Sequence, residues 1–282
     1  MIRQITVIGA GTMGQGIAQV TSIHGIPTRL CDVSAEALTA ASGRIDASVE
    51  KGIAKGKTPA SARDQLKRCL SLSTQLDEAC RESDFVIEAV PELLDLKARI
   101  LASVEQAVSS DAIIATNTSS LPVSKLASGL EHPERFVGMH FFNPVPIMAL
   151  VEVVRGGASS DHAVDSAVSL AVALGKEPIV VRDSPGFATS RLGLVIGLEA
   201  IRMLEAGVAS AEEIDKAMEL GYRHPMGPLR LTDLVGLDVR LAIAEYLHEE
   251  IGEQFRPPEL LRQLVSKGHL GKKTGQGFHS WS

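Results

Sequence analysis

The sequence predicts an α/β fold, in which a Rossmann-like, mostly parallel sheet with helices on both faces precedes a smaller all-helical domain. Over the first ~185 residues, short β-rich runs alternate with stretches of helical periodicity. The strand runs are mostly apolar, which is typical of a parallel sheet buried on both faces. Beyond the segment DSPGF at 183–187 no convincing strand occurs, and its Pro-Gly is a natural break. We therefore expect two domains, residues 1–184 and 185–282.

The expected strands and helices of the first domain follow from hydrophobic periodicity. Apolar runs predict strands at residues 4–9, 28–32, 84–90, 112–117, 135–142, 150–154 and 178–183. Between the early strands, apolar residues recur at helical spacing in three stripes: Met13, Ile17 and Val20; Leu38, Ala41, Ile45 and Val49; and Leu93, Leu96, Ile100, Val104 and Val108. Ser34 and the pair Thr58-Pro59 look like helix starts, with Pro59 at the first helical position.

Helix signals also divide the second domain. A helix is expected over roughly 188–206, and another begins at Ser210, which forms a capping-box pattern with Glu213. A third covers 229–252, in one piece or two, and a fourth follows the two prolines at 257 and 258. The whole segment is thus expected to be helical.

Composition limits the partners and the compartment. The chain has 282 residues and a formal net charge of −6, which argues against nucleic acid as a main partner because such binding usually needs a basic surface. The three cysteines, Cys31, Cys69 and Cys80, form no CxxC pair, and their odd number argues against a disulfide framework. A reducing cytoplasm is the simplest setting.

No targeting, membrane or metal-binding signal is expected. The N-terminal MIRQITVIGAG lacks a charged leader followed by an apolar core, so it does not resemble a signal peptide. The most apolar helix candidate, at 193–207, is interrupted by Glu199, Arg202 and Glu205 and is too short and too charged to span a bilayer. The histidines show no metal-ligand spacing, and no HExxH motif occurs.

A dinucleotide site is predicted at the N-terminus. In QITVIGAGTMGQG, the residues Gly9, Gly11 and Gly14 form G-x-G-x-x-G after an apolar strand and before a helix. This arrangement lets a diphosphate approach the helix N-terminus, where the N–H groups and the dipole favour anions. Asp32 ends the next strand at the expected spacing, and its carboxylate would bind ribose hydroxyls and repel a 2′-phosphate. The motif therefore indicates NAD rather than NADP; the alternative is a glycine turn without a ligand.

An acid–base pair is predicted in the segment HFFNPVPIMALVEVV, residues 140–154. Its two ionisable groups, His140 and Glu152, stand in an apolar context, where an unpaired charge is costly. With NAD nearby, a histidine suits removal of a hydroxyl proton, and a carboxylate would orient its ring. Purely structural interpretations stay open for these residues. His140 could be a paired core residue, and Glu152 a surface strand residue. Ser119 or Ser120 in TNTSS at 116–120 could cap a helix.

Six motifs in this order carry a resemblance to a known family. They are VIGAGTMGQGIA, ATNTSSLPVSKLA, RFVGMHFFNPVPIMALVEVV, DSPGF, PMGPLRLTDLVGLD and GKKTGQGF. The chain resembles the short monofunctional L-3-hydroxyacyl-CoA dehydrogenases over essentially its whole length, most of all those of the bacterial 3-hydroxybutyryl-CoA type. The resemblance implies NAD-dependent, reversible oxidation of an L-3-hydroxyacyl-CoA to the 3-ketoacyl-CoA. It also implies a homodimer, with the helical domain contributing to the substrate cleft and to dimerisation.

The resemblance assigns roles by position. His140 would be the general base, Glu152 its orienting partner, and Ser119 a hydrogen-bonding partner of the substrate oxygen near the nicotinamide. Lys51 and Lys55 would lie in a helical arm at about 45–70 that receives the CoA phosphates. The positions expected to touch NAD are the glycine turn with Gly9, Gly11, Thr12, Met13 and Gly14, together with Asp32, Glu92, Lys97, Asn143 and Lys273.

One position departs from the family pattern. In FATSR, Ser190 stands where the family usually has an Asn that helps to position the substrate carbonyl. Serine keeps a donor and an acceptor but is shorter and lacks the amide pair, and a bridging water could fill the gap. The departure puts substrate specificity in doubt. Two alternatives therefore stay open: a dehydrogenase of a hydroxy acid without CoA, and a non-catalytic NAD-binding protein.

Overall fold

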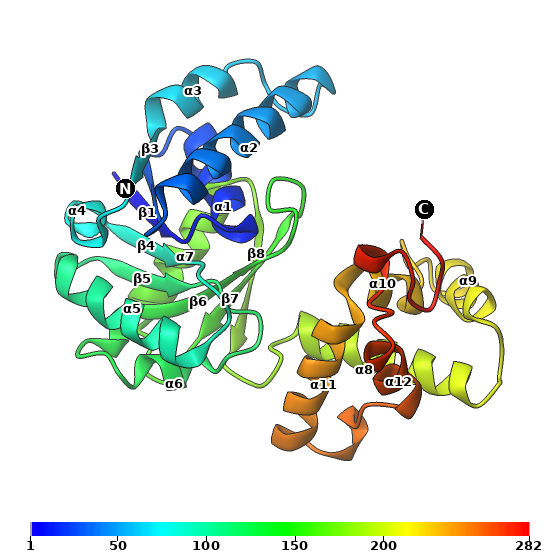
Figure 1. Cartoon of the computed structure of the whole chain (residues 1–282). Coiled ribbons are helices and arrows are strands. Elements are labelled where there is room, and N and C mark those ends of the chain that lie inside the picture. The colour runs from blue at the N-terminus through cyan, green and yellow to red at the C-terminus, as the bar shows by residue number, and fades with distance from the viewer. Residues whose placement is uncertain (1, 282) are drawn as a thin grey trace. The chain divides into compact units, whose positions relative to one another are not determined.

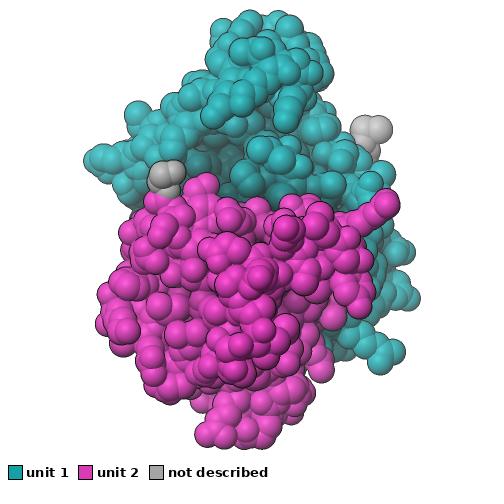
Figure 2. All heavy atoms as spheres, turned by 90° about the vertical axis from the view of Figure 1, so that its right-hand side faces the viewer, with its two compact units in different colours: residues 1–184 teal, residues 185–282 magenta. Residues whose placement is uncertain are grey.

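The computed structural model describes residues 2–281 and divides into two compact units, residues 1–184 and 185–282. Figure 1 traces the chain through both units, and Figure 2 shows them in teal and magenta. Each unit has its own hydrophobic core.

Unit 1 is built on one eight-stranded sheet with the order β3-β2-β1-β4-β5-β6-β7-β8. The first six strands run parallel, β6 and β7 pair antiparallel, and β7 and β8 are parallel again. The mostly parallel α/β fold predicted from the sequence is confirmed. The strands are β1 (Ile5–Ile8), β2 (Thr28–Cys31), β3 (Leu70–Ser73), β4 (Phe85–Glu88), β5 (Ile113–Thr116), β6 (Phe136–Phe141), β7 (Leu150–Arg155) and β8 (Glu177–Arg182).

Helices cover the sheet of unit 1 (Figure 1). The helices α1, α2, α3 and α7 share one core with the sheet, in which Ile17, Ile45 and Ala167 are completely or almost completely buried. The helix α5 packs on β4 and β5, beside α4 and α6. The bounds are α1 (Thr12–Ile23), α2 (Ala35–Ala54), α3 (Ala62–Cys69), α4 (Leu76–Cys80), α5 (Leu94–Ala107), α6 (Val123–Ala127) and α7 (Asp161–Ala173), with a 3₁₀ turn η1 at Pro133–Arg135.

Two local expectations for unit 1 were wrong. The strand β3 has no counterpart among the seven predicted runs, because it is a short edge strand of alternating Leu and Ser with partly exposed side chains. The pair Thr58-Pro59 does not start a helix. Its backbone forms the turn that follows α2, with the amide of Thr58 bonded to the carbonyl of Gly52, and α3 begins only at Ala62. Ser34, in contrast, caps α2 through its hydroxyl as predicted.

Unit 2 consists of helices and their connecting loops, and its described residues, 185–281, form no strand apart from two isolated β-bridges near the C-terminus. The capping box of Ser210 and Glu213 is present, and the expected helix at 229–252 is indeed split, at Gly236. Gly236 has φ of +106°, a conformation that side-chain-bearing residues rarely adopt. The helices are α8 (Thr189–Glu205), α9 (Ala211–Gly221), α10 (Pro228–Val235), α11 (Leu237–Glu250) and α12 (Glu259–Ser266), with 3₁₀ turns η2 (Glu253–Phe255) and η3 (Lys272–Thr274).

Candidate functional site

The glycine turn between β1 and α1 leaves bare backbone at the helix N-terminus. A Cβ on Gly14 would lie 1.8 Å from the carbonyl oxygen of Gly9, so no side chain fits there. Gly9 has φ of +102° and is in turn crowded by the carbonyl oxygen of Ala89. Around Gly11, which precedes α1, no atom lies within 4 Å of an added Cβ, and no side chain caps the helix. Open space in front of uncapped N–H groups is what an approaching diphosphate needs.

Asp32 follows β2 directly and is tied to the glycine turn. One carboxylate oxygen accepts a hydrogen bond from the amide of Ala10 at 2.7 Å, and the other accepts one from the amide of Ser34 at 3.0 Å. Each oxygen of an ionised carboxylate has a second lone pair, so both retain capacity to accept from ribose hydroxyls. The group that the sequence predicts for ribose recognition therefore has a fixed orientation beside the diphosphate position.

Strand register brings His140 and Glu152 together. Because β6 and β7 are antiparallel, His140 and Glu152 are directly opposite each other, and Nδ1 of His140 lies 2.8 Å from Oε2 of Glu152. Glu152 is completely buried and His140 is 7 % exposed. An ionised carboxylate can only accept, so Nδ1–H is the donor, and in the neutral ring the lone pair is then on Nε2. The pair has the geometry of an oriented base.

His140 lines a hollow of about 380 Å³ in unit 1, and Glu152 is buried behind it. It lies where β1, β4, β5 and β6 end, the edge of the sheet at which open α/β folds bind ligands. Its lining includes five residues predicted for the site from the sequence, namely Met13, Glu92, Ser119, His140 and Asn143. It also includes Asn117, which the sequence analysis did not single out and whose side-chain oxygen accepts a hydrogen bond from the amide of Phe141.

Glu92 organises one wall of this hollow. Its Oε1 accepts hydrogen bonds from the hydroxyl of Thr118 and from the amide and hydroxyl of Ser119, the latter two at 2.8 and 3.3 Å. Its other oxygen is 3.3 Å from the ammonium of Lys97. Burial alone would raise the pKa of Glu92, but the charge of Lys97 and these hydrogen bonds outweigh it and lower the pKa below its ordinary value. Glu92 is therefore an anion, and its carboxylate fixes the position of Ser119.

Lys97 lies beneath Glu92, not at the surface of the hollow. Its side chain is 0 % exposed, and its ammonium contacts Glu88 at 2.8 and 3.1 Å and the carbonyl of Val90 at 3.3 Å. Glu88 is also completely buried and accepts further bonds from the hydroxyl of Thr116 and the amide of Val90. The position expected to touch NAD is thus a buried counter-charge for two glutamates.

Neither serine of TNTSS caps the next helix, contrary to the alternative interpretation of that segment. The N-cap residue of α6 is Pro122, which makes no side-chain hydrogen bond to the helix. The capping groups come from Asp183, whose carboxylate accepts from the amides of Val123 and Ser124 at 3.1 and 2.6 Å. The first residue of the DSPGF motif therefore fixes the loop that carries Ser119.

The remaining predicted residues are not gathered around His140 within unit 1. Lys51 lies exposed in the last turn of α2, and Lys55 follows as its exposed C-cap. Thr12 is the exposed first residue of α1. Lys273 belongs to unit 2, where its ammonium bonds to both oxygens of Asp238 at 2.6 Å. Ser190 also belongs to unit 2, in the first turn of α8.

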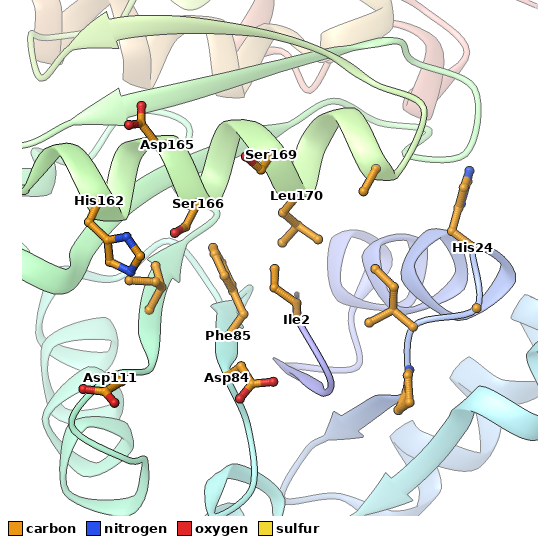
Figure 3. A pocket seen from close by; sticks show the side chains of 15 residues that line it. Ile2, His24, Asp84, Phe85, Asp111, His162, Asp165, Ser166, Ser169 and Leu170 are labelled. Atoms are coloured by element: carbon orange, nitrogen blue, oxygen red, sulfur yellow. The ribbon is translucent and has the colours of Figure 1, made fainter.

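A second and larger hollow, of about 810 Å³, lies at the opposite edge of the sheet. Figure 3 shows its wall along α7, with His162, Ser166 and Leu170 facing Ile2 and Phe85 at the start of the sheet. Asp84, one of the three aspartates that line it, is paired with Arg3. Strand N-termini are not the ligand-binding edge of this fold, and the smaller hollow is the one that His140 lines, so size does not identify the functional site here.

Two further residues were missed by the sequence analysis although a signal for one of them existed. Glu88 is a carboxylate inside the apolar run DFVIEAV, the same anomaly that drew attention to Glu152. Lys176 donates to the carbonyls of Val145 and Met148 at 2.6 and 2.8 Å and so fixes the loop after His140. Burial lowers the pKa of Lys176. No local pattern marks this lysine, because its partners lie about 30 residues away.

Comparison with known proteins decides the family. Residues 4–184 match the family model described as the NAD binding domain of 3-hydroxyacyl-CoA dehydrogenase, and residues 186–281 match that of its C-terminal domain. The chain belongs to the 3-hydroxyacyl-CoA dehydrogenase family. The resemblance inferred from the six motifs is thus confirmed, and with it the classification as an NAD-dependent oxidoreductase family.

Individual members of the 3-hydroxyacyl-CoA dehydrogenase family match over the full length. The chain is 42 % identical to the probable 3-hydroxybutyryl-CoA dehydrogenase of Bacillus subtilis, covering 99 % of this chain and 98 % of that protein. It is 41 % identical to the 3-hydroxybutyryl-CoA dehydrogenase of Mycobacterium tuberculosis, covering 99 % of each. The crystal structure of (S)-3-hydroxybutyryl-CoA dehydrogenase PaaH1 from Ralstonia eutropha superimposes with a TM-score of 0.96 at 42 % identity and covers 100 % of both chains.

Metal-binding clusters and membrane-spanning helices are both absent from the described part of this dehydrogenase. Among residues 2–281, no group of three or more His, Cys, Asp or Glu side chains could hold a metal ion. In the same part of the chain, no helix has the length and hydropathy needed to cross a membrane.

Proposed function

We propose that the protein catalyses the NAD-dependent, reversible oxidation of an L-3-hydroxyacyl-CoA of the 3-hydroxybutyryl-CoA type, with His140 as the general base. The observation that carries the proposal is the hydrogen bond of 2.8 Å between His140 and the completely buried Glu152. It lies in a hollow that Ser119 and Glu92 also line, in a chain of this family.

The glycine turn and Asp32 fit NAD. The uncapped start of α1 beside Gly11 suits the diphosphate, and the carboxylate of Asp32 suits a ribose with free hydroxyls. A 2′-phosphate would place negative charge beside that carboxylate, so we propose NAD rather than NADP. When bound, NAD supplies the hydride acceptor, which no side chain can provide. Met13, Asn143, Glu92 and Lys273 remain proposed contacts of the cofactor, and Lys97 is proposed to act through Glu92.

His140 takes the proton. The lone pair on Nε2 accepts the hydroxyl proton of the substrate as the carbon–hydrogen bond at C3 breaks. The imidazolium that results is stabilised by the negative charge of Glu152, which also fixes the ring. Ser119, held by Glu92 through its backbone amide, turns its hydroxyl from Glu92 and donates a hydrogen bond to the reacting oxygen. In the reverse direction the same imidazolium returns the proton to the alkoxide.

The binding of the CoA thioester is assigned to residues outside this hollow. Lys51 and Lys55 are exposed cations near the end of α2 and suit the phosphates of CoA. Ser190, in the first turn of α8, is proposed to bind the thioester end of the substrate. We place the reaction in the cytoplasm, which suits three cysteines that are all free thiols.

A homodimer is proposed through unit 2. Large apolar side chains of α8, α10 and α11 are exposed in the single chain, among them Leu192 at 61 %, Leu234 at 46 % and Val239 at 42 %. The helices α8, α10 and α11 pack against one another. Monomers rarely expose so many large apolar groups on adjacent helices, and a second copy would bury them.

The test is a coupled assay that reads NADH absorbance. With acetoacetyl-CoA and NADH the protein should turn over, and His140→Ala should lower kcat by ~10²-fold or more, the scale of a general base. NADH affinity should change little. A matched control is His132→Ala, which removes an exposed imidazole paired with Glu134. Near-normal turnover in His140→Ala would refute the assignment of the base.

The same assay separates the alternative functions. Turnover of free 3-hydroxybutyrate in preference to its CoA thioester would indicate a dehydrogenase of hydroxy acids without CoA. No turnover of either compound, with NADH still bound, would indicate a non-catalytic NAD-binding protein.

A further inference from the structure

A charged residue occupies a core position in unit 2. The buried face of α11 consists of Leu237, Arg240, Ala244 and Leu247, spaced as a helical stripe that faces the core. Three of these positions are apolar, as a packed helix requires. The fourth is Arg240, which is only 6 % exposed.

The guanidinium of Arg240 has no counter-charge in the protein. Within residues 2–281 it forms no ion pair and no hydrogen bond, and its Nε is buried without a partner. Burial alone lowers the pKa of Arg240 to about 10, so it remains a cation at neutral pH. Arg135 is the contrasting case: its Nε also lacks a partner, but its terminal nitrogens bond to the carbonyl of Ser109 at 2.6 Å and lie 3.6 Å from Glu105. An unpaired buried cation is costly, and proteins normally avoid it.

The cation lies against the helix that carries Ser190. Its two terminal nitrogens are 3.6 and 3.7 Å from the place where a Cβ of Gly193 would be. Gly193 is three residues after Ser190 on α8, so the two share a face of the helix. Gly193 has no side chain, so the guanidinium of Arg240 lies directly against α8, on the face that Gly193 shares with Ser190.

We propose that Arg240 binds a carboxylate at the far end of the acyl chain, so that among 3-hydroxyacyl-CoAs of equal acyl length those with a terminal carboxylate are preferred. The proposal rests on the proposed function, in which Ser190 contacts the thioester end. A carboxylate supplies the charge that the protein does not, and it matches the planar fork of a guanidinium. Ser190 and Gly193 are three residues apart on α8, roughly 4.5 Å along the helix axis, which a few methylene groups span.

The test compares two substrates of equal length. 3-Hydroxyadipyl-CoA and 3-hydroxyhexanoyl-CoA both have six acyl carbons and differ in a terminal carboxylate against a methyl group. The wild-type protein should prefer the adipyl compound in kcat/KM. In Arg240→Met this preference should fall by about 10- to 100-fold, the factor for a lost hydrogen bond to a charged group. Arg240→Lys, which keeps the charge without the fork, should retain part of it.

A stability measurement separates this role from a structural one. Arg240→Met replaces an unpaired buried cation by an apolar side chain of similar length, so its thermal midpoint should rise by a few degrees. A structural arginine would give a fall instead. Sedimentation of the same variant shows whether the subunit assembly has changed.

Several outcomes would overturn the inference. The first is a wild-type protein that does not favour the adipyl compound. The second is an Arg240→Met variant that keeps the wild-type preference. If that variant keeps the preference and its oligomer dissociates, Arg240 belongs to a subunit contact instead. If neither thioester is oxidised, the proposed function itself fails. If only 3-hydroxyhexanoyl-CoA is oxidised well, the inference about Arg240 fails alone.

Discussion

The substitution Glu152→Gln isolates the charge of the residue behind His140. Glutamine keeps the shape of the side chain and an oxygen that can accept from Nδ1 of His140 across the 2.8 Å contact. It removes a negative charge from a completely buried position between β6 and β7. The variant therefore tests electrostatic stabilisation of the imidazolium with little change in packing.

The expected effect follows from Coulomb's law. Two unit charges about 4 Å apart attract by about 4 kcal/mol at an effective dielectric constant of 20. The amide dipole recovers part of this, so a loss of about 3–4 kcal/mol in the transition state, or ~10²- to 10³-fold in kcat, is expected. Because the effect appears only once the proton has moved to the ring, KM and NADH affinity should change little.

The assay is oxidation of NADH by acetoacetyl-CoA, with NADH binding followed separately by fluorescence. Glu105→Gln is the matched control, because Glu105 is another buried carboxylate of unit 1, with hydrogen bonds from the amides of Glu131 and His132. It should leave kcat near the wild-type value. A kcat for Glu152→Gln within about threefold of wild type would show that the charge contributes less than ~1 kcal/mol and would refute the reasoning.

Two further predictions concern buried groups. Lys97→Met leaves Glu88 buried without its cation, so the free energy of unfolding, measured by urea titration, should fall by about 3–5 kcal/mol. Adding Glu88→Gln should restore part of the loss. A Lys97→Met variant as stable as wild type would contradict this. Burial raises the pKa of Cys31 to about 11 and of Cys80 to about 12, so at pH 8 a thiol reagent should modify only Cys69 in the native protein and all three cysteines after unfolding. The folded state keeps both thiols protonated while the unfolded chain ionises them, so stability should fall as the pH rises from ~8.5 toward 11. Rapid modification of three thiols in the native protein would disprove the burial.

Signals confined to a short segment predicted structure well. The glycine turn, the position of Asp32 after β2 and the capping box of Ser210 each depend on residues that are close in sequence, and each is present. The errors came where neighbours in space decide the outcome. The strand β3 is held by pairing with β2, and its residues carry no apolar run of their own.

In the candidate site, too, some features follow from local sequence and others from tertiary packing. The family, the mostly parallel sheet and the ionisable residues His140 and Glu152 could be recognised without coordinates, because spacing within motifs and hydrophobic periodicity are local properties of the chain. The contact between His140 and Glu152 could not, since the antiparallel register of β6 and β7 sets it. Likewise, packing alone showed Lys97 enclosed between two glutamates and Arg240 buried without a partner, because burial depends on what the rest of the fold places around a side chain.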